Sequence, residues 1–182
     1  MRHIKVRTAT ADDCGELAEL HYQSHTVSYR DFFETDWVVK RERGYYQSYW
    51  HDYLTNQPAS DRTWVALSNK HVVGMATVMP VQGRHAELNA RVHPDLAPGK
   101  VAALRHMHVD PDMLGAGIGR ALMRYVDAYL ITEGYAAAIL DTHPENTRAR
   151  QFFERSGWAF AVRVEDNGIP AVVYHFELHH NS

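Results

Sequence analysis

The stretch that decides the fold runs from Leu104 to Gly119 and reads LRHMHVDPDMLGAGIG. It begins within an apolar segment, Ala102 to Val109, that predicts a buried strand ended by Asp110-Pro111. The glycine-rich run Gly115-Ala116-Gly117-Ile118-Gly119 then predicts a tight turn that opens a helix. Backbone N–H groups and the dipole at such a helix start favour an anionic phosphate, and glycine lets the phosphate approach the backbone. The stretch therefore predicts a strand, a phosphate-binding turn and a helix.

Three other interpretations of this turn are possible. A tight turn that binds nothing is the simplest of them. A Walker loop requires Gly-Lys-Ser/Thr, and Gly119-Arg120-Ala121 does not provide it. A dinucleotide fingerprint requires a third glycine, but Arg120 and Leu122 occupy the positions three residues after Gly117 and Gly119. Asp141, at the end of the next strand, does match the ribose-binding acid of that fold, so the dinucleotide interpretation stays open as the weaker one.

The remaining pattern predicts one mixed α/β domain over residues 1–182, with a central sheet of about six or seven strands flanked by helices. Strands are expected at 4–7, 64–67, 72–79, 136–140, 158–164 and 171–178, and helices from Thr10, after Gly119 and at 146–156. Residues 82–100 contain Gly83, Pro94, Pro98 and Gly99 and are expected to form a long loop. Gly157 suits the left-handed position that follows a helix end.

Composition excludes several classes of protein. The net charge of -3 and the lack of a basic block argue against a nucleic-acid-binding surface. No apolar run approaches the roughly 20 residues that span a bilayer. The lone Cys14 and the lack of a leader-like start after Met1 favour a cytoplasmic location, with no membrane partner.

Two groups of residues are candidates for general-base chemistry. His106 and His108 lie two apart on the predicted central strand and therefore share one face of the sheet. Asp141 and His143 follow the next strand. A histidine has a pKa near neutrality and can remove a proton from an amine, or it can simply be hydrogen-bonded in the core. Two histidines without a third nearby ligand do not predict a metal site.

The segment from Tyr22 to Tyr53 is unusually aromatic. Helical spacing of Tyr45, Tyr49 and Tyr53 predicts a helix that packs on the core, which is the commoner reason for such a pattern. Tyrosines mixed with acids could also hold a cationic amine, with help from cation–π contacts. The residues expected to bind such a substrate are Tyr22, Tyr29, Asp31, Phe32, Glu34 and Asp36.

Two segments together resemble the GNAT superfamily of N-acetyltransferases. Gly117-Ile118-Gly119 matches the glycine positions of its acetyl-CoA motif, which follows a strand ending in valine. Asn146, Ala149, Phe152-Phe153 and Gly157-Trp158 match its second conserved segment, in the right order. The resemblance covers residues 4–178 in topology and 104–160 in motif detail.

This resemblance implies that acetyl-CoA is the cofactor. The pantetheine arm would pair with backbone at Met107 and Val109, and the pyrophosphate would lie on the turn. The implied cofactor-binding set is Met107, Val109, Leu114, Gly115, Ala116, Gly117, Ile118, Gly119, Arg120, Asn146 and Phe153.

Three positions depart from the family pattern. Leu114 replaces a polar Gln or Arg near the pyrophosphate. Phe153 replaces the tyrosine that many members use as the acid for the leaving thiolate, and phenylalanine has no proton to donate. Ala103 falls near the place of the usual catalytic glutamate. Acid and base catalysis must therefore come from other groups or from water.

The sequence as a whole favours a cytoplasmic N-acetyltransferase that transfers acetyl directly, in a ternary complex, to the primary amine of a small molecule. A polyamine, an amino acid or an aminoglycoside-like antibiotic fits that chemistry. A protein or peptide N-acetyltransferase and a non-catalytic CoA-binding regulatory domain are the alternatives. Members of the family are commonly homodimers, and nothing in the residues decides the oligomeric state.

Overall fold

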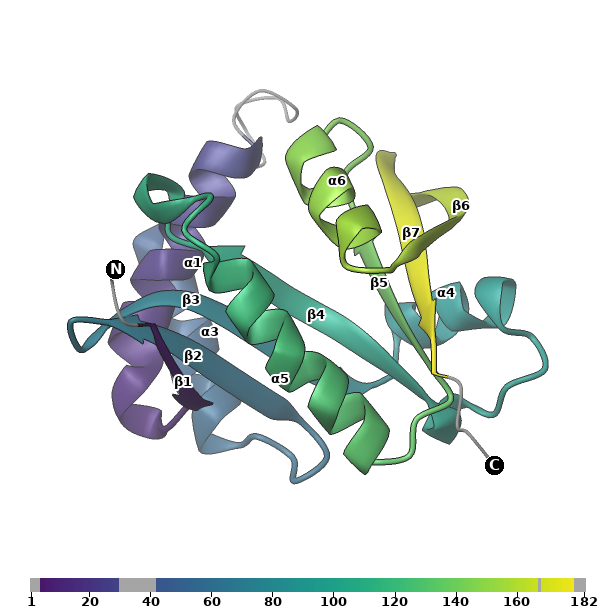
Figure 1. Ribbon diagram of the computed structural model, residues 1–182, viewed down its shortest axis with the longest axis horizontal. Coiled ribbons are helices and arrows are strands. Elements are labelled where there is room, and N and C mark those ends of the chain that lie inside the picture. Colours follow the sequence, from purple (N-terminus) through teal and green to yellow (C-terminus); the bar gives the residue numbers. More distant parts are fainter. Residues whose placement is uncertain (1–3, 30–41, 167, 179–182) are drawn as a thin grey trace. The chain divides into compact units, whose positions relative to one another are not determined.

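The computed structural model describes residues 4–29, 42–166 and 168–178. Within these residues, seven strands form one mixed sheet in the order β1-β2-β3-β4-β5-β7-β6 (Figure 1). The strands are β1 (Lys5–Thr8), β2 (Arg62–Ser68), β3 (His71–Pro80), β4 (Val101–Val109), β5 (Ala137–Thr142), β6 (Ala159–Asp166) and β7 (Ile169–Glu177). The helices are α1 (Cys14–Tyr29), α3 (Arg43–Thr55), α4 (Arg84–Val92), α5 (Ile118–Thr132) and α6 (Thr147–Arg155). The predicted fold class is confirmed.

The chain divides into two compact units. Unit 1 comprises residues 1–77 and 106–125, and unit 2 comprises residues 78–105 and 126–182. β3, β4 and α5 each contribute residues to both units.

Unit 1 is built on the antiparallel pair of β1 and β2, in which Lys5 lies opposite Leu67 and Thr8 opposite Trp64. α1 and α3 bury their apolar faces in a common core with β2 and β3. The largest fully buried members of that core are Leu17, Trp50, Val65 and Met75. Removing such side chains from water is the main stabilising contribution to this unit.

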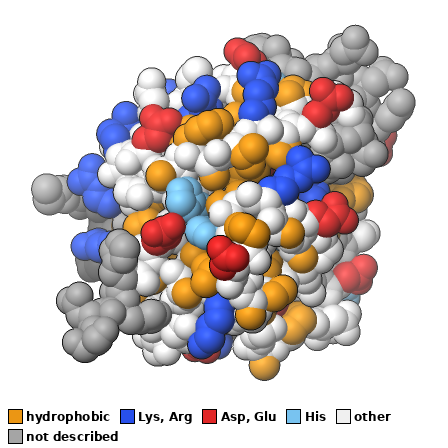
Figure 2. All heavy atoms as spheres, turned by 90° about the vertical axis from the view of Figure 1, so that its right-hand side faces the viewer, with side chains coloured by type: hydrophobic (Ala, Val, Ile, Leu, Met, Phe, Trp, Pro, Cys, Tyr) orange, Lys and Arg blue, Asp and Glu red, His pale blue; other side chains and the backbone are white. Residues whose placement is uncertain are grey.

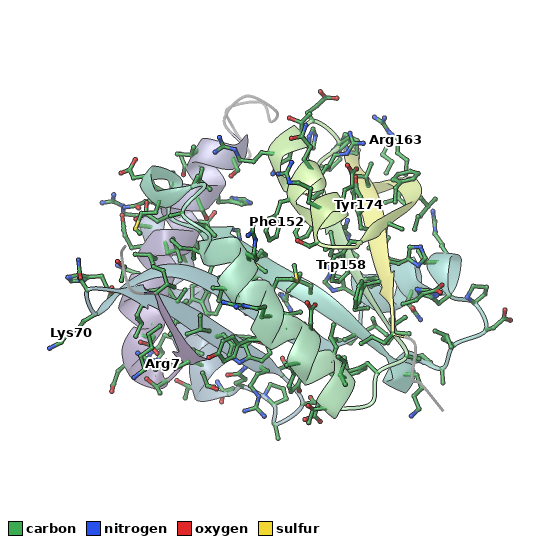
Figure 3. All side chains as sticks on the ribbon, in the orientation of Figure 1. Arg7, Lys70, Phe152, Trp158, Arg163 and Tyr174 are labelled. Atoms are coloured by element: carbon green, nitrogen blue, oxygen red, sulfur yellow. The ribbon has the colours of Figure 1, made fainter. Side chains whose placement is uncertain are left out.

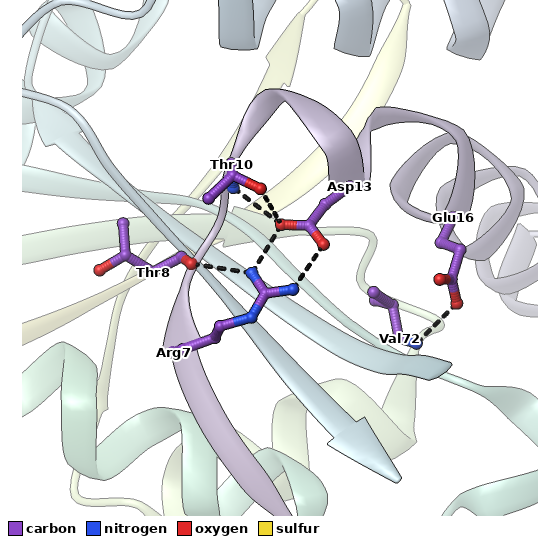
Figure 4. Close-up of polar contacts among 6 residues, drawn as sticks. All are labelled: Arg7, Thr8, Thr10, Asp13, Glu16 and Val72. Carbon is purple, nitrogen blue, oxygen red and sulfur yellow. Dashed lines mark hydrogen bonds and ion pairs between the residues drawn. The ribbon is translucent and has the colours of Figure 1, made fainter. Parts of the chain in front are cut away.

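An ion pair fixes the chain between β1 and α1. The Arg7 guanidinium donates from Nη1 and Nη2 to the two carboxylate oxygens of Asp13, each at 2.7 Å (Figure 4). The backbone N–H of Thr10 also donates to Asp13, at 2.7 Å, and closes a capping box at the first helical turn. The bond from Arg7 outweighs the effect of burial and lowers the pKa of Asp13. Glu16 accepts a further bond from the N–H of Val72, at 2.8 Å.

Unit 2 contains the parallel pair of β4 and β5 and the antiparallel pairs of β7 with β5 and β6. The parallel pairing joins Val101–Ala103 to Ala137–Ile139, and β5 continues to Thr142. Met79, Ile139 and Val173 are fully or almost fully buried in its core. Tyr174 joins β7 to α6 by hydrogen bonds. Its hydroxyl donates to Glu154 at 2.7 Å and accepts from Arg150 Nε at 3.1 Å.

The prediction of a long loop over residues 82–100 is wrong. This segment forms the helix α4 and the short 3₁₀ helix Pro98–Lys100. Leu88 is buried and Val92 packs on the same core, at the i, i+4 spacing that places both on one helix face. Gly83 and Pro94 therefore flank a helix and do not mark a continuous loop.

The aromatic segment is helical where the structure describes it. α1 extends to Tyr29 and α3 begins at Arg43, and residues 30–41 lie outside the described residues. Gly157 has a φ of 89° directly after α6, which confirms its predicted left-handed conformation.

Candidate functional site

The glycine turn has the geometry of an anion cradle. After β4, Gly115 and Gly117 adopt φ values of 83° and 84°, a region that side-chain-bearing residues rarely enter. No heavy atom lies within 4 Å of the position a Cβ would take at either glycine, so the turn is open on that side. Ala121 N–H donates to Gly117 at the first turn of α5. The N–H groups of Ile118, Gly119 and Arg120 precede that bond and, in the first helical turn, have no intrahelical acceptor.

Charge and polarity around this turn are mixed. Arg120 is exposed beside the helix start, where it can add a positive charge to the backbone donors. Leu114, in the position where the family carries Gln or Arg, is 40% exposed. The anion-binding capacity of the turn therefore resides in backbone N–H groups and Arg120.

Gly74 on β3 supports this helix start, a role that no local sequence pattern predicts. A Cβ at Gly74 would lie 2.6 Å from Ile118 Cγ2 and 3.1 Å from Leu122 Cδ1. Both of those side chains are fully or almost fully buried. The absent side chain lets the first turn of α5 pack directly on β3.

His106 and His108 do share one face of β4, as predicted, and in unit 1 they join a cluster of histidines and aromatic residues. His21 on α1 lies between them, with ring centroids 5.0 Å from His106 and 4.4 Å from His108. The other members are His25 on α1 and Tyr46, Tyr49 and Trp50 on α3.

Tyr49 contacts His106 directly. The tyrosine hydroxyl lies 2.8 Å from His106 Nε2, so one of the two donates to the other. Their rings meet edge to face, with centroids 5.7 Å apart. This pair can hold or pass a proton, because both partners can act as donor and acceptor.

His108 is held as a neutral ring. Ser24 Oγ donates to the main-chain oxygen of His21 at 3.2 Å and lies 2.8 Å from His108 Nδ1. With its only proton used, Ser24 accepts from Nδ1–H, and the lone pair of His108 is then on Nε2. Burial, with a smaller contribution from repulsion by His25, lowers the pKa of His108 to about 3.

His21 is also fixed in one tautomer. Trp50 Nε1–H can only donate, and it does so to His21 Nδ1 at 3.2 Å. Neutral His21 therefore carries its proton on Nε2. His25 is bonded through Nδ1 to the hydroxyl of Tyr46, at 2.9 Å.

His21, His106 and His108 each bring one nitrogen to within 4.8 Å of the others, a spacing a metal ion could use. The sequence predicted no third ligand near the pair, and His21 supplies one. Each of the three rings also has a hydrogen-bond partner within unit 1, so the cluster is held together by protein groups alone.

Asp141 and His143 belong to unit 2. Asp141 lies 2.8 Å from Arg84 Nη1 and 3.5 Å from His85 Nε2. Burial alone would raise the pKa of Asp141, but the bond from His85 and the charge of Arg84 together lower it. A carboxylate held in this way is a weak base. Burial lowers the pKa of His143, whose Nδ1 accepts from the N–H of Glu145 at 3.2 Å.

Asn146 and Phe153 also belong to unit 2. Asn146 caps α6, because its Oδ1 accepts from the N–H of Ala149 at 3.2 Å. Phe153 is buried on α6, where its ring packs against Phe152 and Trp158; these two neighbours are labelled in Figure 3. Both residues therefore have structural roles in unit 2, and their cofactor contacts stay predictions.

Of the expected substrate-binding residues, the structure describes the side chain of Tyr22. Its ring packs 5.9 Å from that of Tyr46, and the guanidinium of Arg43 lies over it at 5.0 Å. Tyr22 already stacks on a cation of the protein itself. Asp31, Phe32, Glu34 and Asp36, and the side chain of Tyr29, lie outside the described residues.

Sequence reasoning missed three residues that organise the histidine cluster: His21, Ser24 and Tyr49. His21, Ser24 and His25 recur at the i, i+3 and i+4 spacing of one helix face, which is a readable signal. The partner of Ser24 on β4, His108, lies more than eighty residues further along the chain. No local pattern reveals such a contact.

Comparison with known proteins identifies the family. The model of the Acetyltransferase (GNAT) family matches residues 26–158. The chain therefore belongs to the GNAT acetyltransferase family. No helix in the described ranges combines the length and the apolar composition needed to cross a membrane.

Three individual proteins illustrate the relationship. The mycothiol acetyltransferase of Cellulomonas flavigena is 43% identical over 67 residues, which cover 36% of this chain and 19% of that protein. The N-acetylaspartate synthetase of Danio rerio is 27% identical over 116 residues, or 64% of this chain and 36% of that protein. The chain thus matches well under half the length of these two relatives. The PaiA N-acetyltransferase of Thermoplasma acidophilum, solved in complex with coenzyme A, shares the fold with a TM-score of 0.76 and 13% identity, over 97% of this chain and 99% of that one.

Proposed function

We propose that the chain is an acetyl-CoA-dependent N-acetyltransferase that acts on a primary amine of a small molecule by direct transfer in a ternary complex. One observation carries the proposal. A single strand, β4, bears His106 and His108, and one short 3₁₀ helix, Pro111–Met113, separates its end from the glycine turn at the start of α5. A proton-accepting cluster and an anion cradle are thereby joined by one short piece of backbone.

The cofactor fits the donor groups of the turn. Two or more backbone N–H groups, a helix dipole and Arg120 suit the pyrophosphate of acetyl-CoA. The structural relative PaiA was solved with coenzyme A, which supports the same ligand here. Met107 and Val109 would present backbone to the pantetheine arm, and Leu114 would add an apolar contact beside it. When bound, acetyl-CoA supplies the acetyl thioester.

His106 is the base we assign to the reaction. An alkyl amine, like a lysine side chain, has a pKa of about 10 and must lose a proton before it can attack. His106 can accept that proton directly or through water while Tyr49 holds the ring in place. His108 is the poorer choice, because a pKa of about 3 means that it gives up a proton too readily to store one.

No acid is needed at the position of Phe153. Ordinary thiols have a pKa of about 8.5, so a thiolate is a better leaving group than an alkoxide. Phe153 packs inside unit 2 and offers no proton. The departing thiolate can take its proton from water or from protonated His106.

The relatives support a small acceptor. The two curated relatives are named for mycothiol and for N-acetylaspartate, which are small molecules. The aromatic and histidine side chains of α1 and α3 also suit a compact cationic amine. A peptide N-terminus and a non-catalytic role remain as outcomes of the test.

The test is release of CoA thiol from acetyl-CoA in the presence of amino acids, polyamines, aminoglycosides and short peptides. We expect release above hydrolysis with one small-molecule class, and its loss in Gly117→Trp, because tryptophan at a φ of 84° would be strained and would fill the cradle. Release with peptides alone would favour a protein acceptor. If no amine caused thiol release while acetyl-CoA binding was measured in the same samples, that result would contradict catalysis.

A further inference from the structure

A second cluster of metal-binding side chains lies in unit 2, where the chain leaves α4. His93 follows the last residue of α4, and His175 and Glu177 lie two residues apart on β7, on one face of the strand. Each of the three offers one ligand atom, and these atoms all lie within 4.8 Å of one another. Figure 2 shows the side of the molecule with α4 and the C-terminal strands, where histidine side chains surface between acidic ones.

One imidazole nitrogen from each histidine of this cluster is buried without a hydrogen bond. Within the described residues, His93 Nε2 and His175 Nδ1 are shielded from solvent and have no hydrogen-bond partner. His93 is buried, with 9% of its surface exposed. Glu177 Oε1 approaches His175 Nδ1 only to 3.8 Å, which is beyond hydrogen-bond distance. Buried polar atoms are normally satisfied, so these two indicate a missing partner.

We propose that His93, His175 and Glu177 bind a Zn²⁺ ion. Two imidazole nitrogens and a carboxylate oxygen are a ligand set that zinc uses in proteins. The ion would satisfy both buried nitrogens at once and neutralise the carboxylate beside them.

The surroundings of the cluster agree with this ligand. The backbone at His93 is fixed, since its N–H donates to Asn89 at 2.7 Å and its carbonyl accepts from Leu96 at 3.1 Å. Zinc–nitrogen bonds are about 2.0–2.1 Å long, so the ligand atoms would draw closer to one another when the ion binds.

The fourth zinc position has space and a candidate ligand. A hollow of about 370 Å³ is lined by both His93 and Glu177, and Asp95 lines it too. Water or the Asp95 carboxylate could complete a tetrahedral site there.

The sheet register gives the ion a structural role. His175 lies opposite Ile139 and Glu177 opposite Ala137, beside the part of β5 that pairs with β4. A bound ion would tie the chain after α4 to β7 at that end of the strand. The expected effect is therefore on the stability of unit 2.

The other histidine trio is a weaker metal site. His21 accepts a hydrogen bond from Trp50, His106 is hydrogen-bonded to Tyr49 and His108 donates to Ser24, and a metal would have to break or compete with some of these bonds. The proposal therefore requires zinc binding to depend on His175 and not on His106.

The test is calorimetric titration of the untagged, metal-free chain with ZnCl₂. We expect tight binding that weakens by more than about 100-fold in H175A and E177Q, since loss of even an outer-shell partner typically costs about 10- to 100-fold. Glu177 has an exposed side chain, so E177Q should fold normally. Circular dichroism and the melting temperature check that both variants fold.

Two control variants test the histidine trio of unit 1 and the two histidines near the C-terminus. H106A should bind zinc as the wild type does, and so should a chain with both His179→Ala and His180→Ala, which removes the neighbouring pair near the C-terminus. Zinc should also raise the melting temperature of the wild type but not of E177Q. Failure of the wild type to bind, or affinity that is unchanged in folded H175A and E177Q, would overturn the proposal.

Discussion

His106 and His108 lie two residues apart on β4, yet their surroundings differ. Burial, with a smaller contribution from repulsion by His25, keeps His108 neutral, with a pKa of about 3. His106 instead contacts a tyrosine hydroxyl, which can donate or accept. Proton transfer is therefore assigned to His106, and His108 would not titrate over the pH range in which an enzyme of this kind is assayed.

The bond between Tyr49 and His106 can be tested by removing one oxygen atom. Tyr49→Phe keeps the ring packing but loses the 2.8 Å contact. A hydrogen bond contributes about 0.5–1.5 kcal/mol, so we expect kcat to fall about 2- to 12-fold with little change in KM for acetyl-CoA. Tyr45→Phe is the matched control, because Tyr45 is exposed one turn earlier on α3. Equal turnover in Tyr49→Phe and the wild type would remove the tyrosine from the mechanism.

Asp141 was expected as a possible base, but its bonds to Arg84 and His85 favour a structural role. Arg84→Met should leave this buried carboxylate short of a partner and lower the free energy of unfolding by about 1–3 kcal/mol. Chemical denaturation measures that loss. kcat at a temperature where the variant is folded should be unchanged, and a large fall in kcat would restore Asp141 as a catalytic candidate.

Among the contacts between elements, the one between β3 and the first turn of α5 is the most sensitive to added side-chain volume. Gly74→Ala would bring a Cβ to 2.6 Å from Ile118 Cγ2. Overpacking of this kind costs about 1–3 kcal/mol, and it would also displace the N–H groups of the turn. We expect a lower melting temperature together with weaker acetyl-CoA binding.

Gly15→Ala is the control for that variant. Gly15 lies within α1, and a Cβ there would meet no heavy atom within 4 Å. Alanine in a helix is about 0.5–1 kcal/mol more favourable than glycine, so this variant should be at least as stable as the wild type. If Gly74→Ala behaved like Gly15→Ala, the close packing of β3 on α5 would be refuted.

The ion pair of Arg7 and Asp13, between β1 and α1, predicts an acid-sensitive contribution to stability. Because the folded state lowers the pKa of Asp13, its contribution is fully present above the unfolded pKa of about 3.9 and disappears as the pH falls through the folded value. Asp13→Asn should cost about 1–2 kcal/mol at neutral pH. The difference between Asp13→Asn and the wild type, measured by urea unfolding, should shrink below about pH 4. A difference that is constant with pH would contradict the assignment.

Sequence patterns revealed the strands, the glycine turn and α6 because each depends on local signals. The Gly-rich run, the N-cap at Asn146 and the stop at Gly157 all act within a few residues of their own position. α4 escapes such patterns because glycine and proline beside it are typical of a loop, although here they flank a helix with Leu88 and Val92 on one face.

The candidate site was only partly predictable for the opposite reason. His106 and His108 could be placed on one strand face, but their partners come from α1 and α3, far away in the sequence. Gly74 is one of many glycines, and its close contact with Ile118 is a property of packing. The His93 cluster likewise joins α4 to β7.

For the whole molecule, binding of acetyl-CoA should stabilise the folded state. A ligand at about 100 times its Kd adds about 2.7 kcal/mol, which corresponds to a rise in Tm of about 5–10 °C for a chain of this size. Thermal melting with and without acetyl-CoA measures the shift. Gly117→Trp should melt with no shift, and a full shift in that variant would mean that the turn does not hold the cofactor.

The proposed function requires transfer of acetyl to an amine with His106 as the base. The most direct measurement is mass spectrometry of the amine product formed from isotopically labelled acetyl-CoA, with wild type and His106→Ala assayed together at equal acetyl-CoA occupancy. We expect a labelled amide from the wild type and a rate of amide formation lower by about 100-fold or more in the variant. A general base contributes about 10²- to 10⁴-fold to the rate of such a reaction. Equal rates in both proteins, or no labelled amide while acetyl-CoA is bound, would contradict it.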